Sequence, residues 1–244
     1  MIKIEIPSWA HDVAFRICKA RESHFRNQFK IRKMEEAVAD DPELVKHVEG
    51  VIGYIGDICA CCLLGIDPKE QLRTMVAETD LLTHRDEYDI AYRGWRIDVK
   101  VEFYPDVYFD KILNQTITEK EAYGCRLINA NQFRQNAHTI DQYLFSTMDN
   151  MDPRIARYWY PVGWIQKEKI IKECPSPLSV SPAGLSLHTP AYIIPTRILN
   201  PSDSLVDLPE KPAELPQGRN RPQTMDEIKK IRYEAFLETL GLQR

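Results

Sequence analysis

The chain has 244 residues, of which 43% are apolar and 28% are charged, and its net charge is −4 at neutral pH. This size suits one sizeable domain, with or without extensions. No apolar run reaches the length of a membrane span, and the N-terminal "MIKIEIPSWAHDVAF" lacks the apolar core of a signal peptide. We therefore expect a cytoplasmic protein with no membrane partner.

The first predicted helix, over residues 8–33, is basic although the whole chain is acidic. From residue 16 to residue 33 it carries seven Lys or Arg side chains and a single acid, Glu22. Such a patch predicts a surface that meets phosphates. A solvated helix face is an equal alternative. The candidate nucleic-acid-binding residues are Arg16, Lys19, Arg26 and Lys30.

A second helix is predicted over residues 42–64, with "DDPE" as its start signal and "LGIDP" as its stop. Its apolar residues keep helical spacing, so it packs into the core. Gly53 and Gly56 are costly inside a helix and indicate that another backbone or a ligand approaches closely. Asp57 is an acid in an otherwise apolar turn. The cysteines of "CACC" are interpreted as small buried residues rather than as a metal cluster or a disulfide framework.

The middle of the chain favours strands, and its end favours an extended arm. Helices followed by several strands predict an α/β or α+β fold, with one mixed sheet flanked by helices, and α/β is the class we expect. The predicted strands are residues 87–92, 95–103, 142–147, 159–165 and 191–198. The predicted organisation is a basic helical segment (1–40), a core domain (41–199), a Pro-rich linker without core elements (200–223) and a C-terminal helix (224–244).

The stretch "YDIAYRGWRIDVKVEF", residues 88–103, predicts a β-hairpin with a tight turn at Arg93 and Gly94. This register places Asp89 directly opposite Asp98, and like charges at such a pair are destabilising. In the second strand, apolar residues alternate with Asp98, Lys100 and Glu102. The charged face is therefore open to water, or a cation lies between the carboxylates.

Two carboxylates within reach of each other are natural ligands for Mg²⁺, with Mn²⁺ as the expected substitute. A neighbouring lysine orients a nucleophilic water or stabilises negative charge on a phosphate. Asp89, Asp98 and Lys100 are therefore the candidate catalytic residues for phosphodiester hydrolysis. The acid-x-Lys triplet also occurs at residues 67–69 and 227–229, but only the one at Asp98 lies on an alternating strand.

These residues carry a resemblance to a known superfamily. "YD" at residues 88–89, followed by "DVK" at residues 98–100, resembles the active-site signature of the PD-(D/E)XK nucleases, which have the restriction-endonuclease-like fold. "DQYLFSTMD" and "YPVGWIQKEKI" resemble the next two strands of small phage and bacterial members. The resemblance covers about residues 45–200. Tyr88 replaces the leading proline, and Asp98 stands where many members have Glu.

The resemblance implies a metal-dependent DNA nuclease of bacterial or phage origin, on a mixed sheet with a helix on either side. It implies that Asp89 and Asp98 hold Mg²⁺, that Asp57 completes the metal shell, and that the carbonyl of Val99 joins the coordination. Lys100 then serves the water or the scissile phosphate. Many members act as dimers, so a homodimer joined through the C-terminal helix is an open prediction.

Two other interpretations stay open. The first is a catalytically inactive nucleic-acid-binding or assembly protein on the same fold. The second is a structural domain whose charged hairpin face is only solvated. The intact Asp89, Asp98 and Lys100 favour the enzyme, because an inactive descendant has no reason to keep an unfavourable carboxylate pair. DNA specificity, and endonuclease against exonuclease action, are not separated by the sequence.

Overall fold

The computed structural model describes residues 2–21, 32–78, 89–136, 138–212, 237, 238 and 241. No helix in these ranges is long and apolar enough to cross a membrane. The helices are α1 (Ala10–Arg21), α2 (Arg32–Ala37), α3 (Pro42–Val45), α4 (Val48–Leu64), α5 (Pro68–Glu78), α6 (Asp106–Leu113), α7 (Ala130–Gln135) and α8 (Lys167–Glu173). The strands are β1 (Ile4–Glu5), β2 (Ile90–Tyr92), β3 (Trp95–Val101), β4 (Cys125–Asn129), β5 (Gln142–Met148), β6 (Tyr158–Gln166), β7 (Leu178–Val180) and β8 (Ser186–Pro195). Two short 3-10 helices follow, η1 (Thr196–Ile198) and η2 (Ser202–Leu205).

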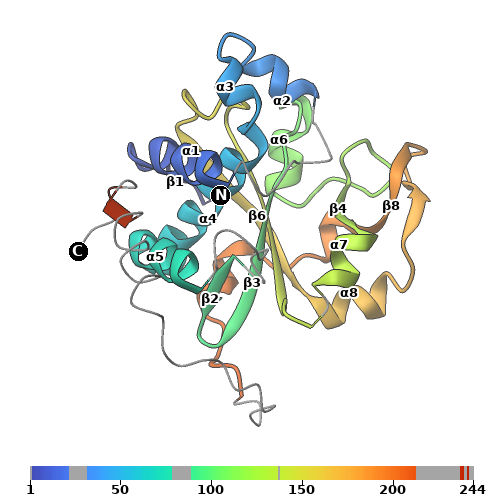
Figure 1. Ribbon diagram of the computed structural model, residues 1–244. Helices are drawn as coiled ribbons and strands as arrows, with labels where there is room; N and C mark the ends of the chain where they lie inside the picture. The colour runs from blue at the N-terminus through green and yellow to red at the C-terminus, as the bar shows by residue number, and fades with distance from the viewer. Residues whose placement is uncertain are drawn as a thin grey trace.

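A mixed sheet is the centre of the fold, as the sequence predicts. In the described part of the chain it has five strands in the order β1-β6-β5-β3-β2. β3 and β5 are parallel, and every other neighbouring pair is antiparallel. α1, α4 and α5 lie on one side of this sheet, while α7, α8, β4 and β8 lie on the other (Figure 1). The α/β class with flanking helices is therefore confirmed.

β5 separates two hydrophobic cores, because it is buried along its whole length. Leu144 faces the first core, which the sheet shares with α1 and α4. Tyr143 and Phe145 face the second core, which the sheet shares with α6, α7, α8 and β8. A strand that is apolar on both faces belongs in the middle of a sheet that is covered on both sides. β5 is the neighbour of β3, so the predicted hairpin adjoins a strand of the sheet that is covered on both faces.

α4 crosses the first core in close contact with β3. A Cβ atom added to Gly56 would collide with the side chain of Val101, so the predicted close approach is confirmed there. At Gly53 an added Cβ would meet nothing within 4 Å, so the prediction is wrong for that glycine. α4 ends at Gly65, whose φ of 68° is in the left-handed region that glycine adopts without strain.

The N-terminal residues share the first core with the rest of the chain. Strand β1 pairs with β6, with Ile4 opposite Trp159 and Glu5 opposite Tyr158. Ala10, Ala14 and Ile17 of α1 are fully buried. Residues 2–21, the first half of the predicted segment 1–40, therefore pack within the same core as the predicted domain 41–199.

A second sheet, which the sequence did not predict as a separate unit, covers the second core. In the described residues it holds three antiparallel strands in the order β4-β8-β7. β8 includes most of the predicted strand 191–198, whereas β4 and α7 come from a polar stretch of the chain. β4 is buried only at two alternate positions, Arg126 and Ile128, and one of these is a charged residue. The strand therefore lacks the apolar alternation by which a strand is predicted from sequence.

The first half of the predicted Pro-rich linker packs against the domain. Leu205 and Leu208 are buried in the first core, so the prediction that residues 200–223 contain no core element is wrong for this part. Residues 213–223 of that linker, and most of the predicted C-terminal helix, lie outside the described residues. Leu237 is half-buried against the first core.

We call residues 206–211 the strap, because they run along the turn of the hairpin. Hydrogen bonds join the strap to the hairpin. Hairpin side chains donate to strap carbonyls from Tyr92 Oη to Val206 O at 2.9 Å, from Arg93 Nη1 to Leu208 O at 2.6 Å and from Trp95 Nε1 to Pro209 O at 2.8 Å. In the other direction, the backbone N–H of Lys211 donates to the carbonyl of Arg93 at 2.9 Å. The ammonium of Lys211 also lies 3.0 Å from Asp141 Oδ1, and Asp141 in turn bonds Arg96 of β3. The strap therefore joins the C-terminal part of the chain to the predicted catalytic hairpin.

Candidate functional site

Asp98 and Lys100 form an ion pair on β3 in which the carboxylate is buried and the lysine is partly exposed. The Nζ atom of Lys100 lies 2.6 Å from Oδ2 of Asp98, and Asp98 is only 5% exposed. In register, Asp98 pairs with Tyr143 and Lys100 with Phe145, so both charged side chains lie on the face of the second core. The alternative of a hairpin face open to water is therefore wrong for Asp98.

Asp89 does not stand directly opposite Asp98 in the ladder. The hairpin pairs as predicted from Tyr92–Trp95 to Ile90–Ile97, where the ladder ends. The N–H of Asp89 then donates to the carbonyl of Ile97 at 3.0 Å, and the N–H of Val99 donates to Oδ2 of Asp89 at 2.6 Å. The backbone N–H of Val99 therefore stabilises the charged form of the Asp89 carboxylate, and the register pair that the sequence predicted, Asp89 opposite Asp98, does not form.

The predicted carboxylates all act on Lys100. Burial by itself lowers the pKa of Lys100, but the negative charges around it outweigh burial and raise that pKa above its ordinary value. The carboxylates responsible are Asp98, Asp89 and Asp57. Asp57 is buried on α4, which packs against β3. The negative charges of all three predicted acids therefore act on Lys100, and Asp98 is the one in direct contact with it.

A complete metal shell is not assembled from these acids. Within the described ranges, no group of three or more His, Cys, Asp or Glu side chains is arranged to hold a metal ion. Asp98 and Asp89 come from the same hairpin, and carboxylate oxygens are the ligands that Mg²⁺ prefers. Among the described residues Asp57 therefore does not complete a three-carboxylate group, and a Mg²⁺ ion held by Asp89 and Asp98 alone would have to keep several waters. Val99 lies between Asp98 and Lys100 on β3.

Tyr143 is a polar neighbour of Asp98 that the sequence analysis missed. It is 2% exposed, and its hydroxyl makes no hydrogen bond within the described residues. Burial raises the pKa of Tyr143, and the negative charge of Asp98 raises it further. The pattern of β5 hid this residue, because "QYLFSTM" is typical of a buried strand and only the register places Tyr143 beside Asp98.

Glu102 continues the charged face of β3 and joins it to the second sheet. Its Oε2 lies 2.5 Å from Nη1 of Arg126, which is fully buried on β4, and it accepts a hydrogen bond from Tyr104 Oη at 3.0 Å. Arg126 also donates to the carbonyl of Tyr123. The guanidinium therefore neutralises Glu102 and fixes β4 next to the end of β3.

The predicted basic surface is only partly described. Arg16 and Lys19 are exposed on α1, and Arg16 forms an ion pair of 2.7 Å with Asp12 one turn earlier. Arg26 and Lys30 lie outside the described residues. The ion pair lowers the positive charge that Arg16 offers to a phosphate. Binding of nucleic acid by these four residues therefore stays a prediction.

Two of the three cysteines of "CACC", Cys59 and Cys61, are buried as the sequence predicts, and Cys62 is half-buried. All of them fall in the described ranges, and none forms a disulfide there. Cys59 and Cys61 of α4 are buried, and burial raises the pKa of both thiols. A buried thiol with a raised pKa is unreactive, which favours a packing role for both.

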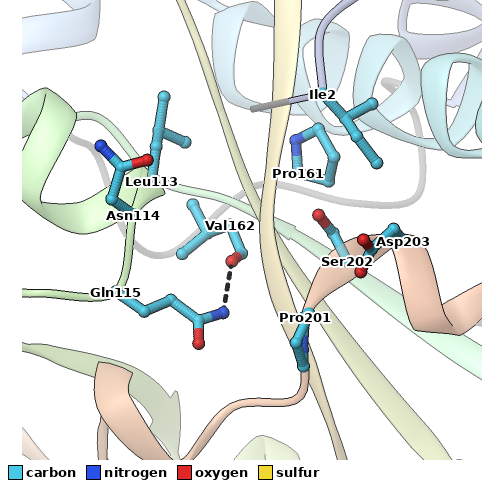
Figure 2. A pocket seen from close by; sticks show the side chains of 9 residues that line it. All are labelled: Ile2, Leu113, Asn114, Gln115, Pro161, Val162, Pro201, Ser202 and Asp203. Atoms are coloured by element: carbon cyan, nitrogen blue, oxygen red, sulfur yellow. Dashed lines mark hydrogen bonds between the residues drawn. The ribbon is translucent and has the colours of Figure 1, made fainter.

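A surface pocket lies away from the predicted site. It is formed by the end of α6, by β6 and by the start of η2, and the Nε2 atom of Gln115 donates to Val162 O at 2.9 Å along its wall (Figure 2). Its lining includes no residue of the predicted site. β5 lies between β6 and β3 in the sheet, so this pocket is separate from Asp98 and Lys100.

Comparisons with known proteins found no match. No protein-family model, no curated protein and no solved structure matches the chain. The function is therefore inferred from the residues of the chain and their geometry.

Proposed function

We propose that the protein is a metal-dependent nuclease that hydrolyses DNA phosphodiester bonds. The observation that supports it most is the largely buried pair of Asp98 and Lys100 on β3, with Asp89 directly before the neighbouring strand β2. A buried charge pair is expensive to keep for stability alone, because desolvation offsets much of its attraction. Charged groups held in a covered site are typical of catalytic centres.

We further propose that the fold is restriction-endonuclease-like. The hairpin β2–β3, the parallel neighbour β5 and the antiparallel β6 form a mixed sheet with helices on both faces, which is the arrangement that the resemblance implies. The acid and lysine of the "DVK" motif lie on the second strand of that hairpin. The first feature supports the proposal independently of the motif, and the second adds that the motif lies where the resemblance implies.

In this proposal Asp89 and Asp98 hold Mg²⁺ together with the carbonyl of Val99. The ion would supply Lewis-acid activation of a water and of the phosphate. The pKa of Lys100 is raised by the carboxylates around it, which favours its positively charged form, so Lys100 would stabilise negative charge on the phosphate rather than accept a proton from water. The oxygen of the water would form the new bond to phosphorus, the P–O bond to the leaving oxygen would break, and the proton lost by the water would pass through solvent to the leaving oxygen.

The test is cleavage of supercoiled plasmid, linear duplex and single-stranded DNA with Mg²⁺, Mn²⁺ or EDTA. We expect metal-dependent cutting that falls by about a thousandfold or more in Asp98→Asn. Asp110→Asn, an exposed acid on α6, is the matched control and should cut normally. Cutting by Asp98→Asn at the wild-type rate would refute the proposal.

A second candidate is a nucleic-acid-binding or assembly protein on the same fold that does not cut. The observation that favours it is the absence, in the described ranges, of an assembled group of three metal-binding side chains. This candidate predicts DNA binding by fluorescence anisotropy that is unchanged by EDTA and by Asp98→Asn, with no cleavage. Metal-dependent cutting by the wild-type protein would exclude it.

A further inference from the structure

Tyr143 and Asp98 are neighbours on adjacent parallel strands. They are register partners of β5 and β3, so their side chains lie on the same face of the sheet. Tyr143 is 2% exposed and Asp98 is 5% exposed. The site described above makes use of Asp98 and leaves Tyr143 without a role.

Each of these neighbours has a buried oxygen that the described residues leave unsatisfied. The hydroxyl of Tyr143 has no hydrogen-bond partner there, and no well-oriented hydrogen bond reaches Oδ2 of Asp98 although Lys100 lies 2.6 Å away. Native proteins satisfy nearly all buried polar groups, either internally or with water or a ligand. Because Tyr143 and Asp98 do not bond each other, the hydroxyl of Tyr143 would be satisfied by a water or a ligand.

The ring of Tyr143 is held in place by an aromatic cluster of the second core. It stacks on Phe133 of α7, with ring centres 5.9 Å apart and planes 18° apart. Phe133 in turn packs on Tyr192 of β8, with ring centres 4.3 Å apart. A ring fixed in this way cannot turn its hydroxyl to solvent without breaking the cluster, so the hydroxyl is preorganised.

We propose that Tyr143 is a further residue of the site, and that its hydroxyl donates a hydrogen bond to an oxygen of a bound phosphate group beside Lys100. A protonated phenol donates one hydrogen bond, and the missing partner therefore has to accept. Lys100 on the same face supplies the positive charge that makes a phosphate the favoured acceptor. This inference rests on the proposed nuclease function.

The test compares Tyr143→Phe, which removes only the hydroxyl, with Tyr192→Phe as the matched control in the same cluster. Three quantities are measured: thermal unfolding without ligand, binding of inorganic phosphate with Mg²⁺ by calorimetry, and kcat/KM for plasmid cleavage. Inorganic phosphate is used because its binding does not depend on a DNA sequence.

We expect Tyr143→Phe to be at least as stable as the wild type, because an unsatisfied hydroxyl has been removed. Its phosphate affinity and its kcat/KM should both fall by about tenfold to a hundredfold, the effect of losing one hydrogen bond to a charged group. Tyr192→Phe should change neither.

Equal phosphate binding in Tyr143→Phe and the wild type would overturn the inference, as would an equal loss in Tyr192→Phe or a wild type that binds no phosphate. A wild type that binds phosphate through Tyr143 but cuts no DNA would refute the nuclease and leave the role of Tyr143 intact. The two failures are therefore distinguishable.

Discussion

At the scale of single residues, the site depends on the ion pair of Asp98 and Lys100, in which each charge offsets part of the cost of burying the other. Asp98 is nearly inaccessible, and Lys100 lies 2.6 Å from it with 20% of its side chain exposed. An unpaired buried carboxylate is strongly disfavoured, so each member of the pair makes the other tolerable. The lysine therefore has a structural effect as well as the proposed catalytic one.

Lys100→Met should destabilise the fold by about 3 kcal/mol, because it leaves Asp98 buried without a counter-charge. The double variant Asp98→Asn with Lys100→Met should recover most of this loss, since neither charge is then buried. Urea unfolding of the two single variants and the double variant measures the interaction directly. If the double variant lost as much stability as the sum of the two single variants, the pairing of Asp98 with Lys100 would be contradicted.

The stabilisation by this pair should also depend on pH with a defined sign. The folded pKa of Lys100 lies above the unfolded value of about 10.4, so its contribution is fully present below that pH and is lost as the pH rises through the folded pKa. Lys100→Met should lack this part of the alkaline loss of stability.

At the scale of elements, the hairpin and α4 meet with little space between them. Arg93 and Gly94 both have positive φ, 49° and 80°, which matches the tight turn that the twist of a two-stranded ribbon favours. The predicted register is correct up to Ile90 and Ile97. It is wrong at Asp89, because a side chain that accepts from the backbone of Val99 ends the ladder.

Gly56→Ala and Gly53→Ala form a matched pair on α4. An added methyl at Gly56 collides with Val101, so we expect a loss of about 1–3 kcal/mol in the free energy of unfolding. The same change at Gly53 meets nothing within 4 Å and should stabilise the helix by up to about 1 kcal/mol. Thermal or urea unfolding of the two variants measures the change in stability. Equal changes at both sites would contradict the close packing of α4 on β3.

At the scale of the whole molecule, the strap connects the C-terminal part of the chain to the hairpin. Its backbone carbonyls accept from the hairpin side chains Tyr92, Arg93 and Trp95. Leu205 before the strap and Leu208 within it are buried in the first core. The strap therefore supports the position of the strand that carries Asp98 and Lys100.

A chain that ends at Asn200 should lose stability, by about 2 kcal/mol for each of Leu205 and Leu208, because both leave the core. A chain that ends at Pro212 keeps these contacts and, among the described residues, loses mainly the half-buried Leu237. Unfolding curves of the two truncated chains measure the difference. Equal stability would show that the strap does not contribute.

The same pair of truncations tests the predicted homodimer. The chain that ends at Pro212 lacks residues 213–244, which include the predicted C-terminal helix, so its mass by light scattering reports on that segment. A full-length dimer that becomes monomeric at Pro212 would support dimerisation through the C-terminal segment. An unchanged oligomeric state would exclude it.

The sequence by itself determined the local features of this protein. Alternation of apolar and charged residues predicted β3, the turn residues predicted the hairpin, and the apolar stripe predicted α4. These features depend on residues that are near each other in the chain, so their periodicity is visible without the fold. The candidate residues Asp89, Asp98 and Lys100 come from one such local pattern.

Only the tertiary structure decided what surrounds those residues. Burial of Asp98, the neighbour Tyr143, the guanidinium of Arg126 beside Glu102 and the strap on the hairpin all join segments that are far apart in the chain. Such contacts follow from strand order and register, which no local pattern encodes. The pattern of charges alone did not decide whether Asp98 is exposed to solvent. The structure shows that packing of β3 against β5 and the second core buries it.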